Sequence, residues 1–188
     1  MKRIYALILI LILSLSSLPV FAQDIDETYF SWPTKSQRIT DTFGTYRSHG
    51  YHKGIDIGSL NKDEYDNPIA GDKIVAAQSG KVVYSGYAYD KNGNPYANLI
   101  AINHDMRGLD FPTDYIQTVY THGSNLQVSV GDTVHRGQYI CDMDGTIGYD
   151  VHLHYETRII DSYDEAYKWS GAQPVNPLMF YRGYIIMQ

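Results

Sequence analysis

The sequence has almost no cysteine, no apolar run long enough to cross a bilayer, and no excess of basic side chains. Its single cysteine, Cys141, leaves no partner for an internal disulfide. Asp and Glu outnumber Lys and Arg by 21 to 15 over 188 residues, for a formal net charge of −6. An acidic chain is a poor candidate for binding nucleic acid through its phosphates. Low-complexity segments and Pro/Ser linkers are also missing, which favours a single domain.

The longest apolar run lies near the first residue and is typical of a signal peptide. A short cationic start precedes an apolar stretch from Ile4 to Leu15, and Val20-Phe21-Ala22 places small residues where a signal peptidase reads. The alternative, a membrane helix, needs about 20 apolar residues. We therefore predict a signal peptide over 1–22 and one domain over 23–188. The protein is then exported to the periplasm, the medium or the cell wall, and no cysteine near the cleavage point offers a lipid anchor.

Short β-branched and aromatic runs, separated by Gly, Asn or Asp, dominate the rest of the chain. Strands are expected over Lys73–Ala77, Gly80–Ser85, Asn98–Asn103, Ile116–Thr121 and Gln138–Cys141. The 18 Tyr residues fit pleated surfaces. Only the stretch from Ser162 to Trp169 has a helical character. We predict an all-β fold with mostly antiparallel pairing.

A weak internal echo suggests a duplicated β unit. The segment Gly71-Asp72-Lys73-Ile74 resembles Gly131-Asp132-Thr133-Val134. Each is followed by another glycine, Gly80 or Gly137, and an apolar strand. Repetition of this kind indicates one structural unit used twice.

Two short patterns bring together side chains that bind metals. One runs from His52 to Asp56, and the other is His152-Leu-His154. Alternate residues of a strand share a face, so His152 and His154 point the same way, as do His52, Gly54 and Asp56. Gly54 would leave room for an ion or a substrate. Taken alone, each pattern is more often a solvated surface group. Together they offer four candidates, His52, Asp56, His152 and His154, for the three protein ligands that catalytic zinc commonly keeps, although the His-Glu-x-x-His motif is absent.

From Trp32 to Met179 the chain resembles the lysostaphin-type zinc metallopeptidases, which include LytM and the β-lytic enzymes and hydrolyse peptidoglycan. The resemblance rests on an ordered series that is more specific than any one motif. Its segments are Trp32-Pro33, Ile39–Gly44, Tyr51–Ile57, Val75–Val82, Ile100–His104, Val119–His122, Val130–Gly137, His152–Glu156 and Val175–Pro177. The resemblance implies a distorted β-sandwich, similar to a duplicated hybrid motif, with an open active-site groove.

The resemblance also implies a role for each matching residue. His52, Asp56 and His154 match the zinc ligands, with one Zn²⁺ per chain. His122 and His152 match two catalytic histidines that help to place or activate water and to stabilise the transition state. Two imidazoles and one carboxylate leave Zn²⁺ a strong Lewis acid, and the metal lowers the pKa of bound water to about 7. A nearby imidazole exchanges protons in the same pH range.

Other polar residues near these motifs could have either a functional or a structural role. Tyr46, six residues before His52, is a candidate for steadying the oxyanion. Glu156 is either a partner of an imidazole on its own strand face or an exposed carboxylate. The remaining histidines, His49, His104 and His135, are expected to be structural or surface residues.

The sequence therefore predicts a monomeric zinc metalloendopeptidase that acts on the peptide cross-links of bacterial peptidoglycan. One alternative is a non-catalytic member of the same fold that binds wall peptides or activates another hydrolase. The resemblance argues against it, because such relatives typically lack ligands. Another alternative is a biotinyl- or lipoyl-type carrier, for which the hairpin at Val130–Val134 lacks a lysine at its tip.

Three segments depart from the usual family pattern. They are 58–71, 106–115 and 145–151, and all three are expected near the cleft, where loop changes alter substrate preference.

Overall fold

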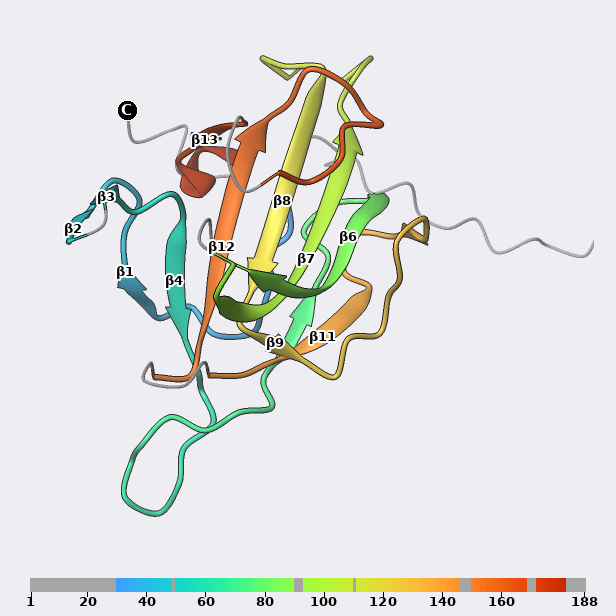
Figure 1. Ribbon diagram of the computed structural model, residues 1–188. Helices are drawn as coiled ribbons and strands as arrows, with labels where there is room; N and C mark the ends of the chain where they lie inside the picture. The colour runs from blue at the N-terminus through green and yellow to red at the C-terminus, as the bar shows by residue number, and fades with distance from the viewer. Residues whose placement is uncertain are drawn as a thin grey trace, which may run out of the picture.

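The computed structural model describes residues 30–48, 50–89, 93–109, 111–145, 150–168 and 172–181 (Figure 1). The signal peptide predicted over 1–22 and the side chain of His49 lie outside the described residues. So do the outermost residues of the predicted domain, 23–29 and 182–188. In the part of the chain that is described, no helix is both long and apolar enough to cross a bilayer.

Strands make up nearly all regular structure among the described residues, which confirms the all-β prediction. One 3-10 turn, η1 (Pro177–Phe180), accompanies them. The strands are β1 (Ile39–Asp41), β2 (Tyr46–Arg47), β3 (Gly50–Tyr51), β4 (Ile55–Gly58), β5 (Lys73–Val75), β6 (Gly80–Tyr89), β7 (Pro95–Asp105), β8 (Tyr115–Thr121), β9 (Gly123–Ser124), β10 (Thr133–Val134), β11 (Tyr139–Met143), β12 (His152–Ile159) and β13 (Gln173–Val175).

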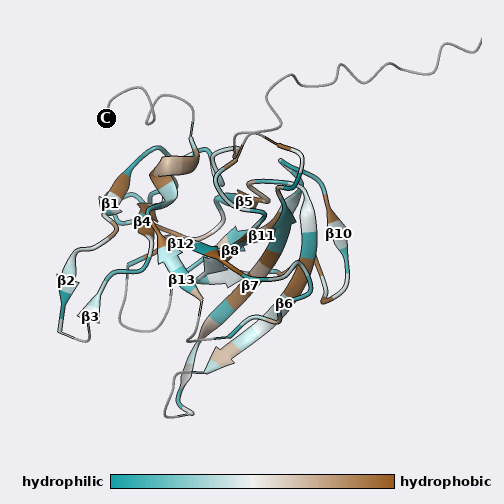
Figure 2. Ribbon diagram, turned by 90° about the horizontal axis from the view of Figure 1, so that it is seen from above, coloured by the Kyte–Doolittle hydropathy of each residue, from teal (hydrophilic) through white to brown (hydrophobic). Residues whose placement is uncertain are grey.

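Every described ladder is antiparallel, and the strands form two packed sheets and a separate hairpin. The large sheet has the order β1-β4-β12-β8-β7-β6-β10, with β13 paired to β12. The small sheet has the order β5-β11-β9, and β2 pairs with β3 alone. Seen from above, the small sheet lies on one side of the large one and the β2–β3 hairpin projects away (Figure 2).

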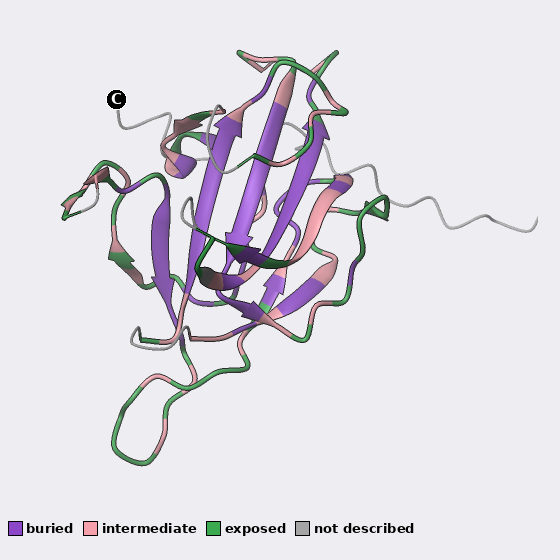
Figure 3. Cartoon of the chain, viewed as in Figure 1, coloured by how far each residue is buried: buried purple, intermediate pink, exposed green. Residues whose placement is uncertain are grey.

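The main core fills the space between the two sheets. Ile55 and Leu153 of the large sheet join Ile74 and Ile140 of the small sheet in one fully buried cluster. Burying such a side chain stabilises the fold by about 1.5–3 kcal/mol. A smaller cluster on the other face of the large sheet includes Leu99. The central strands are consequently buried on both faces (Figure 3).

The internal echo corresponds to a pseudo-two-fold arrangement of two β units. Gly71 N–H donates to the carbonyl of Met143 over 2.9 Å, and Met143 N–H donates to that of Asp72 over 2.7 Å. The second unit repeats this pattern, because Gly131 N–H donates to the carbonyl of Val82 and Val82 N–H to that of Asp132, each over 2.9 Å. The strands are thereby exchanged, so that β5 pairs with β11 and β6 with β10.

The helical character of Ser162–Trp169 is a wrong prediction over its described part, residues 162–168, which form a turn followed by residues without regular secondary structure. The Asn103 amide donates to the carbonyls of both Tyr163 and Glu165 over 2.8 Å. Arg158 Nη1 donates to the carbonyl of Lys168 over 2.9 Å. These tertiary hydrogen bonds capture the carbonyls that a helix would use internally.

Candidate metal centre

Three adjacent strands bring the predicted site residues together. In the antiparallel ladder between β4 and β12, Asp56 lies directly opposite His154. On the other side of β12, His154 lies opposite Thr121, the last residue of β8. The next residue along the chain, His122, therefore comes to the same end of the sheet.

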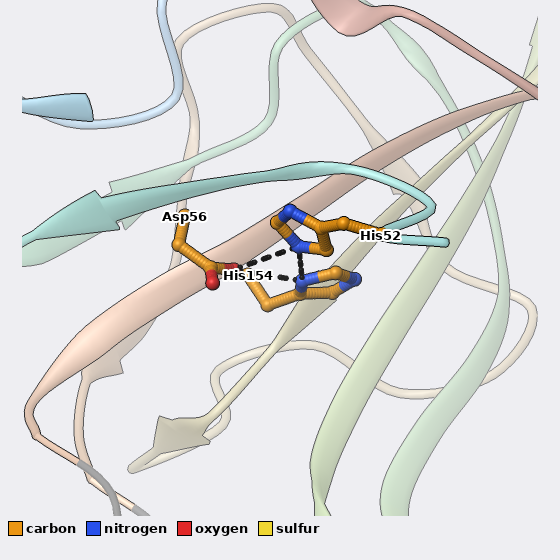
Figure 4. A group of neighbouring side chains, drawn as sticks. All are labelled: His52, Asp56 and His154. Atoms are coloured by element: carbon orange, nitrogen blue, oxygen red, sulfur yellow. Dashed lines mark hydrogen bonds and ion pairs between the residues drawn. The ribbon is translucent and has the colours of Figure 1, made fainter. Parts of the chain in front are cut away.

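His52, Asp56 and His154 form a compact triangle of possible ligand atoms (Figure 4). His52 Nε2 lies 2.9 Å from His154 Nδ1 and 3.1 Å from Asp56 Oδ1, and His154 Nδ1 lies 2.9 Å from Asp56 Oδ1. All three residues are buried. Three side chains separated by up to 102 residues thus meet at one point.

The outer hydrogen bonds of the two imidazoles determine which nitrogens face the triangle. His52 Nδ1 lies 2.9 Å from the carbonyl of Thr42, which only accepts, so the proton sits on Nδ1. His154 Nε2 lies 2.9 Å from Glu156 Oε1, a carboxylate oxygen, so its proton sits on Nε2. In their neutral forms, His52 Nε2 and His154 Nδ1 therefore point lone pairs at a third acceptor, Asp56 Oδ1.

With both imidazoles neutral, three acceptors face one another at about 3 Å and would repel, so in that state the triangle fits a divalent metal ion. In a tetrahedral zinc site with bonds of about 2.0–2.1 Å, neighbouring ligand atoms lie about 3.3 Å apart. The observed separations of 2.9–3.1 Å are close to this value. The donor set of two nitrogens and one oxygen is also common for zinc with an open coordination position.

His52 and Gly54 depart from the strand pattern expected of them. The strand begins only at Ile55, so His52 and Gly54 lie in the preceding loop. A Cβ atom at Gly54 would lie 2.3 Å from the carbonyl oxygen of Tyr155. The glycine therefore allows β12 to approach closely, and the prediction that it leaves room for an ion is wrong.

Glu156 is the partner of an imidazole rather than an exposed carboxylate. It is 7% exposed and accepts from His154 Nε2. Its second oxygen, Oε2, accepts from Arg158 Nε over 2.7 Å. Burial alone would raise the pKa of Glu156, but the bonds from His154 and Arg158 lower it to about 2. Burial would lower the pKa of His154, whereas Asp56 and Glu156 raise it to about 9.

Arg47, which the sequence motifs do not single out, holds the other side of Asp56. Its Nη2 donates to Asp56 Oδ2 over 2.5 Å, and the same nitrogen pairs with Asp41. Burial would raise the pKa of Asp56, but His154 and His52, when they carry a proton on the nitrogen facing it, together with Arg47, keep that pKa far below the usual range. Since Oδ2 is engaged, Oδ1 is the oxygen turned toward the two imidazoles.

The two other predicted histidines pack beside the triangle. The ring centroids of His122 and His152 are 4.5 Å apart. His152 Nδ1 lies 2.7 Å from the carbonyl of Asp150, so Nε2 is the nitrogen left toward the site, 3.8 Å from Asp56 Oδ1. His122 has a left-handed backbone with φ of +67°. Its N–H donates to the carbonyl of Asn98, and its carbonyl accepts from Asp144. Burial, reinforced by neighbouring histidines, lowers the pKa of His122 to about 3.

Two pockets meet at the triangle and make the predicted groove. One, of about 430 Å³, contains His122 and His152. The other, of about 180 Å³, contains Tyr51, Lys53 and Tyr167. Arg47, Tyr96 and His154 line both pockets. Tyr96 has no counterpart among the residues selected from the sequence, because no motif surrounds it.

Tyr46 lines neither of these pockets. It is 73% exposed and packs edge-on against Tyr51, with ring centroids 5.3 Å apart. His104 is fully buried, 2.9 Å from the Ser79 carbonyl and 2.7 Å from Thr118 Oγ1, as expected of a structural residue. His135 is exposed.

The three unusual segments do not all lie near the groove. The segment 58–71 starts at the His152 end of the site, where Ser59 N–H donates to the carbonyl of Val151, and then extends away as a loop (Figure 1). The described residues of 145–151 adjoin His152. The segment 106–115 connects the end of β7 to the start of β8, whereas His122 follows the other end of β8. At about 3.4 Å per residue, the length of β8 separates the segment from His122 by roughly 20 Å. The prediction that this segment lies near the cleft is therefore wrong.

Comparisons with known proteins agree with the resemblance found in the sequence. Residues 50–177 match Peptidase family M23. The chain is 33% identical over 149 residues to the murein hydrolase activator NlpD of Escherichia coli, covering 79% of this chain and 30% of that protein. It is 35% identical over 127 residues to the uncharacterized lipoprotein YgeR of Escherichia coli, covering 68% of this chain and 41% of that protein. The chain thus spans about a third of the length of the curated relatives it matches.

Solved structures share the fold. The catalytic domain of the antimicrobial peptidase lysostaphin from Staphylococcus simulans aligns with a TM-score of 0.52 and 25% identity, over 73% of this chain and 87% of that one. A zinc containing peptidase from Vibrio cholerae aligns with a TM-score of 0.54 and 24% identity, over 79% of this chain and 39% of that one. The second likeness concerns the fold alone.

Proposed function

Because the chain belongs to Peptidase family M23, we propose that it is a zinc-dependent endopeptidase that hydrolyses the peptide cross-links of bacterial peptidoglycan. The observation that carries the proposal is the convergence of three acceptor atoms, from His52, Asp56 and His154, within 2.9–3.1 Å of one another. A zinc ion held by these atoms would supply a Lewis acid for the scissile carbonyl and a bound water of lowered pKa.

The paired histidines beside the triangle are suited to move the protons of the reaction. Burial lowers the pKa of His122 to about 3, which keeps its imidazole neutral at pH 7, with a lone pair that can accept a hydrogen bond from a water. His152 presents Nε2 to the same space, because its Nδ1 donates to the Asp150 carbonyl. Hydrolysis of an amide requires one proton to leave the attacking water and one to reach the departing amine. We assign these two transfers to this pair.

The groove supports a peptide substrate. Its two pockets share Arg47, Tyr96 and His154, so an extended chain can run from one pocket to the other past the triangle. Tyr51 and Tyr96 provide flat surfaces for packing, and Arg47 provides a cation beside the reacting centre. Peptidoglycan is favoured as the source of that peptide by the family and by the relatives. One relative is named a murein hydrolase activator, and another is called an outer membrane antigenic lipoprotein. These names also support a place in the cell envelope, reached by export.

A second candidate function is activation of another hydrolase without catalysis. It is favoured by the 33% identity to a protein named as an activator. The two functions differ in what they require of the site. An activator needs no converging acceptors, whereas this chain retains the complete triangle and both neighbouring histidines. Catalysis is therefore the better supported proposal.

Metal analysis combined with a cleavage assay tests the proposal. The purified protein should contain one zinc per chain and release new amino groups from peptidoglycan. Mass spectrometry of the fragments identifies the bond. In His154→Ala the removal of one acceptor should abolish both zinc and cleavage, whereas His135→Ala changes an exposed histidine and should preserve both. Equal zinc in the wild type and His154→Ala, or no amine release from any wall preparation, would support the non-catalytic function instead.

A further inference from the structure

The polar face of β12 carries a line of contacts that begins at His154 Nε2, the imidazole nitrogen that points away from the triangle. Alternate residues along the strand, His154, Glu156 and Arg158, touch in succession. His154 Nε2 lies 2.9 Å from Glu156 Oε1, and Glu156 Oε2 lies 2.7 Å from both Arg158 Nε and Arg158 Nη2. Each oxygen of the carboxylate therefore has its own partner, one on either side.

Both charged members of this line are buried. Glu156 is 7% exposed and Arg158 is 4% exposed. A buried carboxylate requires a charged or hydrogen-bonding partner, and Arg158 provides one, because its Nε and Nη2 both contact Oε2. Arg158 in turn cannot rotate freely, because its Nη1 donates to the Lys168 carbonyl and its guanidinium lies over the ring of Tyr167, 5.1 Å from the centroid.

The segment that holds Arg158 is itself fixed to the large sheet. The Asn103 amide binds the carbonyls of Tyr163 and Glu165, and Lys81 Nζ lies 2.9 Å from Asp164 Oδ1. A continuous series of contacts thus runs from β6 and β7, through segment 161–168, to Arg158, Glu156 and His154.

We propose that Glu156 and Arg158 are positioning residues for the metal centre, in which Glu156 holds His154 with Nδ1 toward the ion and Arg158 holds Glu156. The inference rests on the proposed function, because it assumes that His154 is a ligand. Neither residue touches the reacting atoms. Their contribution is to fix the tautomer and the ring plane of the imidazole, as outer partners of metal-binding histidines do.

The first test measures zinc affinity directly. The dissociation constant is obtained by competition with a chromophoric chelator on the full folded chain. Glu156→Gln keeps the shape of the side chain and removes its charge, so zinc binding should weaken about 10–100-fold. Glu165→Gln is the matched control, because the Glu165 carboxylate lies in segment 161–168 and accepts from Asp161 N–H over 3.1 Å, away from His154, so its zinc affinity should equal that of the wild type.

The second test separates positioning from simple stability. Arg158→Met leaves Glu156 buried without its cation and should lower the thermal midpoint of the metal-free protein, whereas Arg107→Met removes an exposed arginine and should not. The double variant Glu156→Gln/Arg158→Met contains no unpaired charge. It should recover much of the lost thermal midpoint while zinc binding stays about 10–100-fold weaker than in the wild type.

The outcomes are distinguishable. If Glu156→Gln binds zinc as tightly as the wild type, or if the double variant regains wild-type affinity, the pair is only a structural ion pair and the inference is wrong. In that case the proposed function still stands, because wild-type zinc and cleavage are intact. If the wild type itself binds no zinc, the proposed function fails first.

Discussion

The two faces of β12 are both buried, yet they are stabilised in different ways. On one face Leu153 and Tyr155 are fully buried in the main core and make apolar contacts. On the other, His154 and Glu156 are almost as deeply buried, but each polar atom has a specific partner. The apolar face depends on volume and tolerates approximate fits. The polar face depends on a chain of hydrogen bonds and ion pairs, in which the loss of one group leaves its buried neighbour without a partner.

This difference means that damage to the two faces should be measured by different assays. A change on the apolar face should lower the free energy of unfolding and leave the chemistry of each folded molecule intact. A change on the polar face should alter metal binding or cleavage beyond any loss of stability. Variants on each face separate these two kinds of damage.

The largest expected effect is on catalysis at the edge of the polar face. His122→Ala removes an imidazole that packs 4.5 Å from His152 but contributes no atom to the triangle. The rate of amine release from peptidoglycan should fall about 10²–10⁴-fold, the range for loss of a general acid or base. Zinc content, measured by elemental mass spectrometry, should stay at the wild-type value. Loss of zinc in this variant would mean that His122 is a ligand.

The next largest effect is expected on the apolar face of β12, directly behind the proposed ligands. Leu153→Ala leaves a cavity in the core between the sheets and should destabilise the protein by about 2–5 kcal/mol, measured by denaturant unfolding of the metal-free chain. Zinc affinity of the molecules that remain folded should change little. A large loss of affinity at equal folding would show that the two faces are not separable.

A buried histidine outside the metal centre should make stability depend on pH. Burial lowers the pKa of His104 to about 4 from an ordinary value of 6.5. Above pH 6.5 the residue is neutral in both folded and unfolded chains, so it has no pH-dependent effect. Between pH 6.5 and 4 the unfolded chain binds the proton first, and stability falls. Between pH 7 and 4.5 the loss should be about 2 kcal/mol.

The comparison with His104→Gln isolates that contribution. The variant lacks the titrating group, so its unfolding free energy should fall by about 2 kcal/mol less than that of the wild type over the same pH interval. Parallel curves for the two proteins would contradict the assignment of His104 as a neutral buried base.

The smallest effect is expected at an aromatic residue away from both faces. Tyr46→Phe removes a hydroxyl from a ring that is 73% exposed and lines neither pocket. The rate of cleavage should therefore change by about twofold or less. A tenfold loss of rate with an unchanged Michaelis constant would instead support Tyr46 as an oxyanion donor.

Features that depend on local alternation or repetition were predictable from the sequence. The pattern from His152 to Glu156 places polar and apolar side chains on opposite faces, as observed. The repeated Gly-Asp segments mark the two exchanged units, because each needs a glycine with positive φ, +112° at Gly71 and +97° at Gly131. The same alternation could have included Arg158, which lies two residues beyond Glu156 on the same face.

Features that depend on distant contacts were not predictable. Arg47 reaches Asp56 from a separate hairpin, and no local pattern signals that contact. The stretch after Ser162 has a helical character, but Asn103 and Arg158 bind its carbonyls from elsewhere in the fold. Gly54 could be recognised as unusual, but its reason, the nearby carbonyl of Tyr155, required the register of β4 against β12.

Because of the tight contact at Gly54, one added methyl group would separate the two strands that carry Asp56 and His154. Alanine at this position would push β4 away from β12 just before the point where Asp56 faces His154. A displacement of a few tenths of an ångström at each strand is comparable to the tolerance of a zinc–ligand bond. A residue that offers no donor atom thus fixes the distance between Asp56 and His154, and with it the size of the cation that these two side chains could hold.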